Sequence, residues 1–392
     1  MVRDFVTINK ERIIFLLSLH KMTTKEFLSL VNKGLKKSLC WEDVYCDHLP
    51  INTLKRIDSV FNKGLFYYAD PEEPQRNEAV SVFFRKEKFG SELNLGSRMR
   101  VREFEDLKTR LNTISKLSDV KLRRKLPMCN EQFDPREIAF SIREQVVPVM
   151  TETKREFLKN FINKLGEQNV MVFEFVDASN KKEKANVDGF YLNPNAIVLK
   201  RRQESFSREI FTLAHELGHY LLNQEEIEEV DMATIVQPNM PMSNVESWCN
   251  TFAFYLLLGT ENANLLDHVA YFNAHNDYGH DLVKQISKTT NLSRLSIFTN
   301  LLLQSKLSYD SYVNIKAELE NEWEEKKARK ALQKEIDKIN GVQTHGRNPQ
   351  PIQADIIKDI YNVALSSGVV GEQEYCKAMK IKPSEINTYR YL

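Results

Sequence analysis

Residues 206–223 read FSREIFTLAHELGHYLLN and predict one amphipathic helix built around two histidines, His215 and His219. Residues four positions apart lie one turn from each other on the same face of an α-helix. Two imidazole nitrogens at that spacing can occupy two adjacent corners of a zinc tetrahedron. Glu216 is offset by one residue, so its carboxylate can reach a zinc-bound water and pass a proton from it to a leaving amine. The stretch therefore predicts a hydrolytic zinc site with Glu216 as the catalytic acid/base.

Such a site needs a third protein ligand, and we interpret Glu246 as that ligand. Glu246 opens a second predicted helix, 244–258, and small and mostly apolar residues follow it on the same face. This pattern would bury the carboxylate, and a buried carboxylate needs a metal or a charged partner. The alternative is a capping box, in which Glu246 binds the backbone of Ser243 at the start of the helix.

Two further residues near these ligands carry structural expectations. Gly218 stands between the histidines, where glycine costs a helix about 1 kcal/mol relative to alanine. We therefore expect a close backbone approach at Gly218, by a neighbouring strand. Asn250, one turn after Glu246, can orient a metal ligand by a hydrogen bond without touching the metal itself. The alternative interpretation of Asn250 is a buried asparagine bonded to backbone.

The two elements together resemble the ImmA/IrrE metallopeptidase family. The resemblance rests on the first element, 208–219, and on the second, 246–253, which reads Glu-x-x-Cys-Asn-x-Phe-Ala. The family's second element usually has alanine where this chain has Cys249. The segment DGFYL, 188–192, is also similar to the stretch before the family's first element. Close resemblance covers roughly residues 130–300.

The resemblance implies specific roles. His215, His219 and Glu246 would bind one zinc ion per chain, and Glu216 would be the catalytic acid/base. Members of the family cut a transcriptional repressor, often encoded by a neighbouring gene. We therefore expect a zinc-dependent endopeptidase that cleaves a helix-turn-helix repressor and so induces a stress, mobile-element or antiphage-defence operon.

The 392 residues exceed one ordinary core and predict several domains. Three short strand-like runs, at 170–176, 187–192 and 196–199, stand among helical segments. They predict a mainly helical α+β fold, with a small β-sheet packed on the active-site helix. We expect the following organisation: an Xre-like helix-turn-helix domain at 1–70, a basic helical linker at 71–130, the metallopeptidase core at 131–300 and a C-terminal helical region at 301–392.

The formal net charge of +1 gives no global reason to expect a polyanion partner. Two segments give a local reason to expect such a partner. Residues 9–62 have the order of short helices seen in helix-turn-helix units. The stretch 85–125 holds thirteen basic and six acidic residues, a local charge of about +7. Either segment is a candidate DNA contact, although a solvated helix face also explains the basic stretch.

The cysteines bear on location and on regulation. Five cysteines, scattered and odd in number, argue against a disulfide framework and fit a reducing cytosol. No signal-peptide pattern opens the chain, and the longest apolar runs fall far short of the roughly 20 residues of a membrane span. We expect a cytoplasmic protein with no membrane contact. Cys129, in the loop 127–130, is a candidate inhibitory fourth zinc ligand, and its alternative is an ordinary partly buried cysteine.

Two other functions remain open from the sequence. One is a DNA-binding regulator or sensor in which zinc is structural, which a fourth protein ligand would indicate. The other is a toxin protease of a toxin–antitoxin pair. A small repressor gene beside this one would favour the repressor-cleaving enzyme over the toxin. Tyr191 and Arg208 are both candidates to stabilise the oxyanion, and the sequence does not choose between them.

Overall fold

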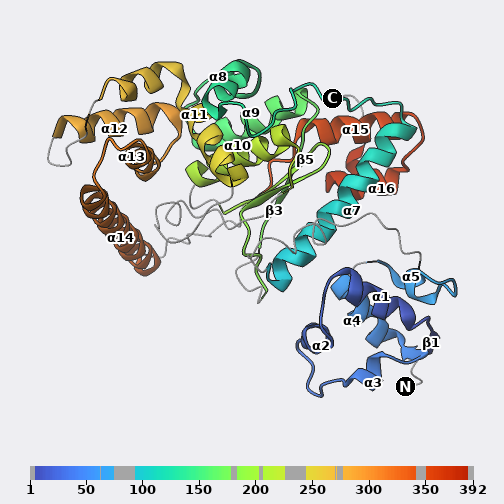
Figure 1. Cartoon of the computed structure of the whole chain (residues 1–392). Helices are drawn as coiled ribbons and strands as arrows, with labels where there is room; N and C mark the ends of the chain where they lie inside the picture. The colour runs from blue at the N-terminus through green and yellow to red at the C-terminus, as the bar shows by residue number, and fades with distance from the viewer. Residues whose placement is uncertain are drawn as a thin grey trace. The chain divides into compact units, whose positions relative to one another are not determined.

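The fold is described from a computed structural model, which describes residues 5–61, 63–74, 93–177, 183–202, 206–225, 244–269, 271, 277–340 and 350–386. The chain divides into two compact units (Figure 1). Unit 1 comprises Met1–Glu105 with Lys182–Asn186, and unit 2 comprises Asp106–Lys181 with Val187–Leu392. No helix in the described ranges is long and apolar enough to span a bilayer.

Unit 1 is a small helical body with its own apolar core. Its elements are β1 (Phe5–Thr7), α1 (Glu11–Leu19), α2 (Thr24–Val31), α3 (Trp41–Val44), β2 (His48–Pro50), α4 (Ile51–Phe61) and α5 (Leu65–Ala69). β1 pairs antiparallel with β2. Thr23 and Glu26 form the capping box that opens α2, with the Thr23 hydroxyl accepting from the Glu26 backbone N–H at 3.2 Å.

The element that follows α2 in unit 1 is short. A recognition helix must be long enough to enter the major groove of DNA. α3 spans four residues and carries two carboxylates, Glu42 and Asp43. The Xre-like interpretation of 9–62 therefore stays a prediction. Residues 85–92 of the basic stretch lie outside the described residues, and the rest of that stretch comprises residues 93–94, α7 (Leu95–Leu117) and the segment after it.

Unit 2 has a mainly helical α+β fold, which confirms the predicted class. Its further elements are α8 (Pro135–Val146), α9 (Lys154–Glu167), β3 (Met171–Phe175), β4 (Gly189–Leu192), β5 (Ala196–Lys200), α10 (Phe206–Leu222), α11 (Asn244–Asp267), α12 (Asp277–Thr290), α13 (Arg294–Leu303), α14 (Tyr309–Ile339), α15 (Asp355–Ser366), α16 (Glu372–Met379) and a 3₁₀ turn, Pro383–Glu385.

The three predicted strands form one sheet in the order β3–β5–β4. β3 runs parallel to β5, and β4 runs antiparallel to it. Nearly all their side chains are buried, which explains why they appear in the sequence as continuous apolar runs rather than alternating ones. α10 packs on β4 and β5 and also contacts α9 and α11 (Figure 1). The sheet and α11 therefore hold α10 on several sides.

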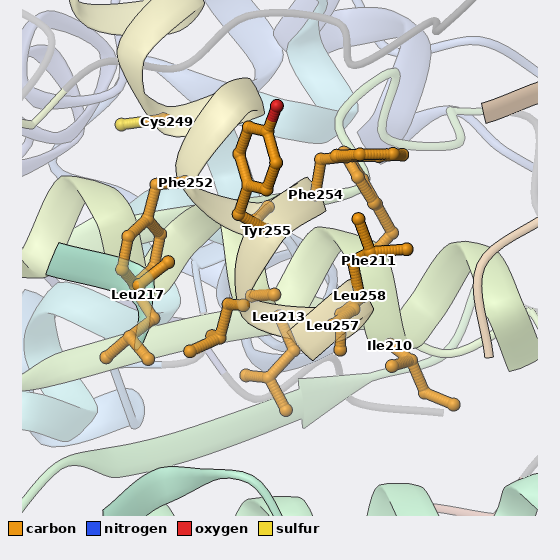
Figure 2. Packing of buried hydrophobic residues seen from close by; sticks show 14 of the residues in the cluster. Ile210, Phe211, Leu213, Leu217, Cys249, Phe252, Phe254, Tyr255, Leu257 and Leu258 are labelled. Atoms are coloured by element: carbon orange, nitrogen blue, oxygen red, sulfur yellow. The ribbon is translucent and has the colours of Figure 1, made fainter. Parts of the chain in front are cut away.

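α10 and α11 pack through a shared apolar cluster. Figure 2 shows Leu213 and Leu217 of α10 beside Phe252 and Leu257 of α11, all fully or almost fully buried. A Cβ atom added at Gly218 would stand 3.0 Å from the Cys249 Sγ and 3.2 Å from the Cys249 Cα. The expectation of a close approach at Gly218 therefore holds, but its neighbour is the backbone of a helix and not a strand.

α11 bends where the sequence predicted its end. Gly259 has φ 76° and ψ 164°, which breaks the helix after Leu258. The Arg143 guanidinium from α8 donates to the Leu256 carbonyl beside this bend. Because the last carbonyls of a helix have no partner inside it, Arg143 caps the first segment of α11.

A buried ion network fixes the amino-terminal end of α10. The Arg201 side chain, fully buried at the end of β5, pairs with Glu209 of α10 at 2.8 Å and with Glu174 of β3. The Gln353 backbone N–H donates to the second Glu174 oxygen at 2.8 Å, so the C-terminal segment joins this network. Losing one partner of a buried ion pair typically costs about 3–5 kcal/mol.

The Gly218 contact yields a stability prediction. In Gly218→Val, the added side chain meets the Cys249 backbone, and overpacking of this kind costs about 1–3 kcal/mol. We expect the free energy of unfolding, measured by chemical denaturation, to fall by that amount. Gly371→Val is the control, because nothing lies within 4 Å of a Cβ at Gly371. A Gly218→Val variant as stable as this control would show that the two helices do not need their close contact.

Candidate metal centre

Three side chains from two helices bring their donor atoms together inside unit 2. α10 supplies His215 and His219, and α11 supplies Glu246. The two histidine Nε2 atoms lie 3.1 Å apart. The Glu246 carboxylate places one oxygen 3.1 Å from the His215 Nε2 and the other 3.2 Å from the His219 Nε2. All three residues are almost completely buried.

These distances fit a small divalent cation. Ligands at about 2.0–2.1 Å from zinc, placed on tetrahedral corners, stand about 3.3–3.4 Å from one another. The separation of the two histidine nitrogens, and that of each nitrogen from its nearer Glu246 oxygen, are 3.1–3.2 Å and come within a few tenths of an ångström of that edge, with a different carboxylate oxygen facing each histidine. Imidazole nitrogen and carboxylate oxygen are also donors that zinc accepts. The three residues can therefore hold three corners of a metal tetrahedron and leave the fourth for water or substrate.

The electrostatics of the group also suit a cation. Burial alone would raise the pKa of the Glu246 carboxyl, but His215 and His219 outweigh it and hold that pKa well below its usual range. Burial opposes charge on His215 as well, and the adjacent Glu246 carboxylate outweighs this effect and raises the pKa of His215. Glu246 thus keeps its charge in the interior, where a charge needs a compensating partner.

The geometry bears on the two readings of Glu246. Ser243, its partner in the alternative capping box, lies outside the described residues. Each Glu246 oxygen faces one imidazole of α10. The Asn250 side chain, one turn on, interacts with His215 and contributes to the raised pKa of this histidine. Asn250 therefore acts on a candidate ligand, as the sequence suggested.

Glu216 lies beside the candidate metal ligands and against the sheet. Its side chain is almost fully buried. A Cβ atom added at Gly189 would stand 3.1 Å from the Glu216 Cγ and 2.7 Å from the Thr212 Cγ2. Only glycine lets β4 approach α10 this closely. The packing function of Gly189 was not predicted, although the residue belongs to the segment 188–192 that carried the resemblance.

The two oxyanion candidates are both engaged in other contacts. The Arg208 side chain donates to the Asp188 carboxylate, with its Nε 2.7 Å from Oδ2, and Arg202 pairs with the same carboxylate. The Tyr191 hydroxyl lies 3.1 Å from the Pro194 carbonyl and 3.0 Å from the Asn223 Oδ1. The structure therefore makes no choice between them. Asp188, which organises both arginines, was not singled out from the sequence.

Cys129 lies near α10 but outside the donor group. Its backbone N–H donates to the Leu221 carbonyl at 2.9 Å, and its side chain belongs to the apolar core. Among the described residues, the group of donor atoms within 4.8 Å of one another holds only His215, His219 and Glu246. Burial raises the pKa of the Cys129 thiol, which disfavours the thiolate that binds metal. Its inhibitory role stays a prediction.

The donor geometry predicts the effect of removing one charge. Glu246→Gln keeps the shape of the side chain but loses the anionic donor, so we expect zinc affinity to fall by more than about 100-fold, the upper range for losing a mere supporting residue. The zinc affinity is measured by competition with a chelator of known affinity. Glu261→Gln, at an exposed site on the same helix, should bind zinc normally. Equal zinc affinity in the two variants would show that Glu246 is not a zinc ligand.

Comparison with known proteins identifies the region that contains this centre. A search of curated proteins and a search of solved structures returned no match. One protein-family model, the IrrE N-terminal-like domain, matches residues 168–285, a segment that includes β3–β5, α10 and α11. Both helices of the candidate metal centre therefore lie within the segment that matches the IrrE N-terminal-like domain.

Proposed function

We propose that the protein is a zinc-dependent endopeptidase that cleaves a helix-turn-helix transcriptional repressor and thereby induces a stress, mobile-element or antiphage-defence operon. One observation carries the proposal: a buried His-His-Glu donor group, with a glutamate beside it, lies inside a domain of a peptidase family. Three protein donors with one open corner are typical of catalytic zinc sites, whereas structural sites are closed by four.

The side chains around the centre fit peptide hydrolysis. A zinc ion held by the three donors would polarise the scissile carbonyl and lower the pKa of a water molecule. Glu216 follows His215 directly on α10 and is buried, so its carboxylate is suited to accept the proton of that water and to deliver it to the leaving amine. The apolar packing of α10 against α11 and the sheet limits the freedom of Glu216 to move away.

The substrate and location follow from the family resemblance and from the thiols. Members of the ImmA/IrrE family cut repressors that are often encoded beside them, so a neighbouring-gene repressor is the proposed partner. All five cysteines are free thiols, which is compatible with the reducing cytoplasm in which such a repressor works. We also propose that residues 9–62 or 85–125 contact DNA. The four-residue helix α3, which lies within 9–62, does not support DNA contact by the first of these segments.

The alternatives can be separated experimentally. A regulator with structural zinc would need a fourth protein ligand, and the described residues supply three. A toxin protease would have a broader set of targets, and its neighbouring gene would encode an inhibitor that it does not cut.

The role of Glu216 predicts a separation of binding from chemistry. Glu216→Gln removes the group that moves the proton but none of the three donors. We expect zinc affinity within about twofold of wild type and a cleavage rate lowered by about 10²–10⁴-fold, the usual contribution of general acid–base catalysis. The assay follows cleavage of the purified neighbouring repressor by electrophoresis, with and without single-stranded DNA, and uses Glu261→Gln as the control variant.

Two outcomes would count against the proposal. Cleavage by Glu216→Gln at the wild-type rate would show that the chemistry takes another route. An intact repressor under every condition, with zinc bound to the wild-type protein, would leave the metal centre but reject the repressor as substrate.

A further inference from the structure

We infer that Arg124 is a positioning residue of the metal centre, acting on His219 through the carboxyl-terminal end of α10. The inference deepens the proposed function, on which it rests. Arg124 lies far upstream of both helices, in the basic segment that follows α7. It touches none of the three donor side chains, and its action is through the backbone and the ring of the next residue, Tyr220.

The first observation is a set of hydrogen bonds at the end of the helix. The Arg124 Nη2 donates to the Tyr220 carbonyl at 2.6 Å and lies 3.3 Å from the Leu221 carbonyl. The last carbonyls of an α-helix have no partner within the helix, and a cation there also meets the negative end of the helix dipole. Arg124 therefore caps α10 at the residue that directly follows His219.

The second observation is a ring contact at the same residue. The Arg124 Cζ lies 3.9 Å from the centroid of the Tyr220 ring. Tyr220 is fully buried, and its ring makes an edge contact with Tyr191 of β4 at a centroid distance of 5.9 Å. A guanidinium over a buried aromatic face is attractive, so Tyr220 is held between Arg124 and the sheet. Fixing Tyr220 fixes the adjoining backbone of His219.

The third observation is that the segment beginning at Arg124 reaches both metal-binding helices. We name residues 124–134 the strap. Arg124 bonds to the strap's own carbonyls, with its Nε 3.1 Å from that of Leu126. The Cys129 N–H donates to Leu221 of α10 at 2.9 Å, and the Trp248 indole N–H of α11 donates to the Phe133 carbonyl at 2.8 Å. The strap therefore ties the end of α10 to the start of α11, two residues from Glu246.

The side chain at this position must be arginine rather than another cation. One planar guanidinium makes bonds from Nε and Nη2 to carbonyls of the strap and of α10 while its face lies on Tyr220. A lysine ammonium keeps the charge, but it has no planar face and cannot reproduce this fork of donors. Residues that orient metal ligands from behind typically contribute about 10–100-fold to metal affinity.

The test compares Arg124→Lys with Arg123→Lys. Arg123 is the exposed neighbour, so its substitution repeats the chemistry without the contacts. For Arg124→Lys we expect the zinc dissociation constant to rise by about 10-fold or more. We also expect a changed visible spectrum of the cobalt-substituted protein, a lower kcat and a KM within about twofold of wild type. Arg123→Lys should match wild type in every readout. A purely structural role would lower thermal stability and leave the cobalt spectrum of the folded protein unchanged.

A second variant covers the case in which Arg124→Lys does not fold. Trp248→Phe keeps a ring beside Phe252 but removes the indole donor at the far end of the strap. It should weaken zinc binding by a smaller factor, about 2–5-fold, in proportion to one lost hydrogen bond. Wild-type zinc affinity and cobalt spectra in both variants would overturn the role of Arg124. Zinc affinity and the cobalt spectrum are both measured without a substrate. A wild-type protein that binds zinc but cuts no repressor would therefore contradict the proposed function without contradicting the role of Arg124.

Discussion

The contact of α10 with α11 at Gly218 and Cys249 is the constraint on which the candidate site depends. The candidate metal donors are split between these helices, two on α10 and one on α11, and they converge within 3.1–3.2 Å. A Cβ atom at Gly218 would stand 3.0–3.2 Å from Cys249, so the absence of a side chain sets how closely the helices approach. Gly189 does the same between α10 and β4, where it brings the sheet against Glu216. Two glycines thus let backbone approach α10 from two sides, and the local cost of Gly218 to the helix, about 1 kcal/mol, is offset by that approach.

Charged side chains then hold the two helices at their ends. The Arg201 network grips α10 near its beginning, Arg124 caps its end, and Arg143 caps the first segment of α11 at the bend of Gly259. Each guanidinium adds a charged donor to carboxylates or carbonyls at the end of a helix. The middle of each helix packs by apolar contacts, and the ends are fixed by directional ones. The donor group, which carries a buried negative charge on Glu246, sits between these fixed ends and is suited to a cation.

The sequence predicted what is local in the chain. The strands, α10 and the facing of His215 and His219 follow from periodicity and spacing over a few residues, and the structure agrees. Glu246 required more, because it stands on another helix and its spacing also fits a cap. The apolar face of its helix and the family resemblance favoured the metal ligand, and the sequence left the cap open. The neighbour of Gly218 was predicted wrongly as a strand, because a glycine signals a close approach but not the element that makes it. Arg124 gave no signal, because it binds backbone carbonyls, which have no side-chain pattern, and its basic surroundings resemble a solvated surface.

The coordination of the metal is the most direct test of the central claim. X-ray absorption at the zinc edge of the purified wild-type protein reports which atoms surround the ion and at what distance. We expect one zinc per chain with nitrogen and oxygen neighbours only, at about 2.0–2.2 Å, including two imidazoles. A protein that takes up no zinc, or a spectrum with a sulfur neighbour at about 2.3 Å, would contradict an open His215–His219–Glu246 site.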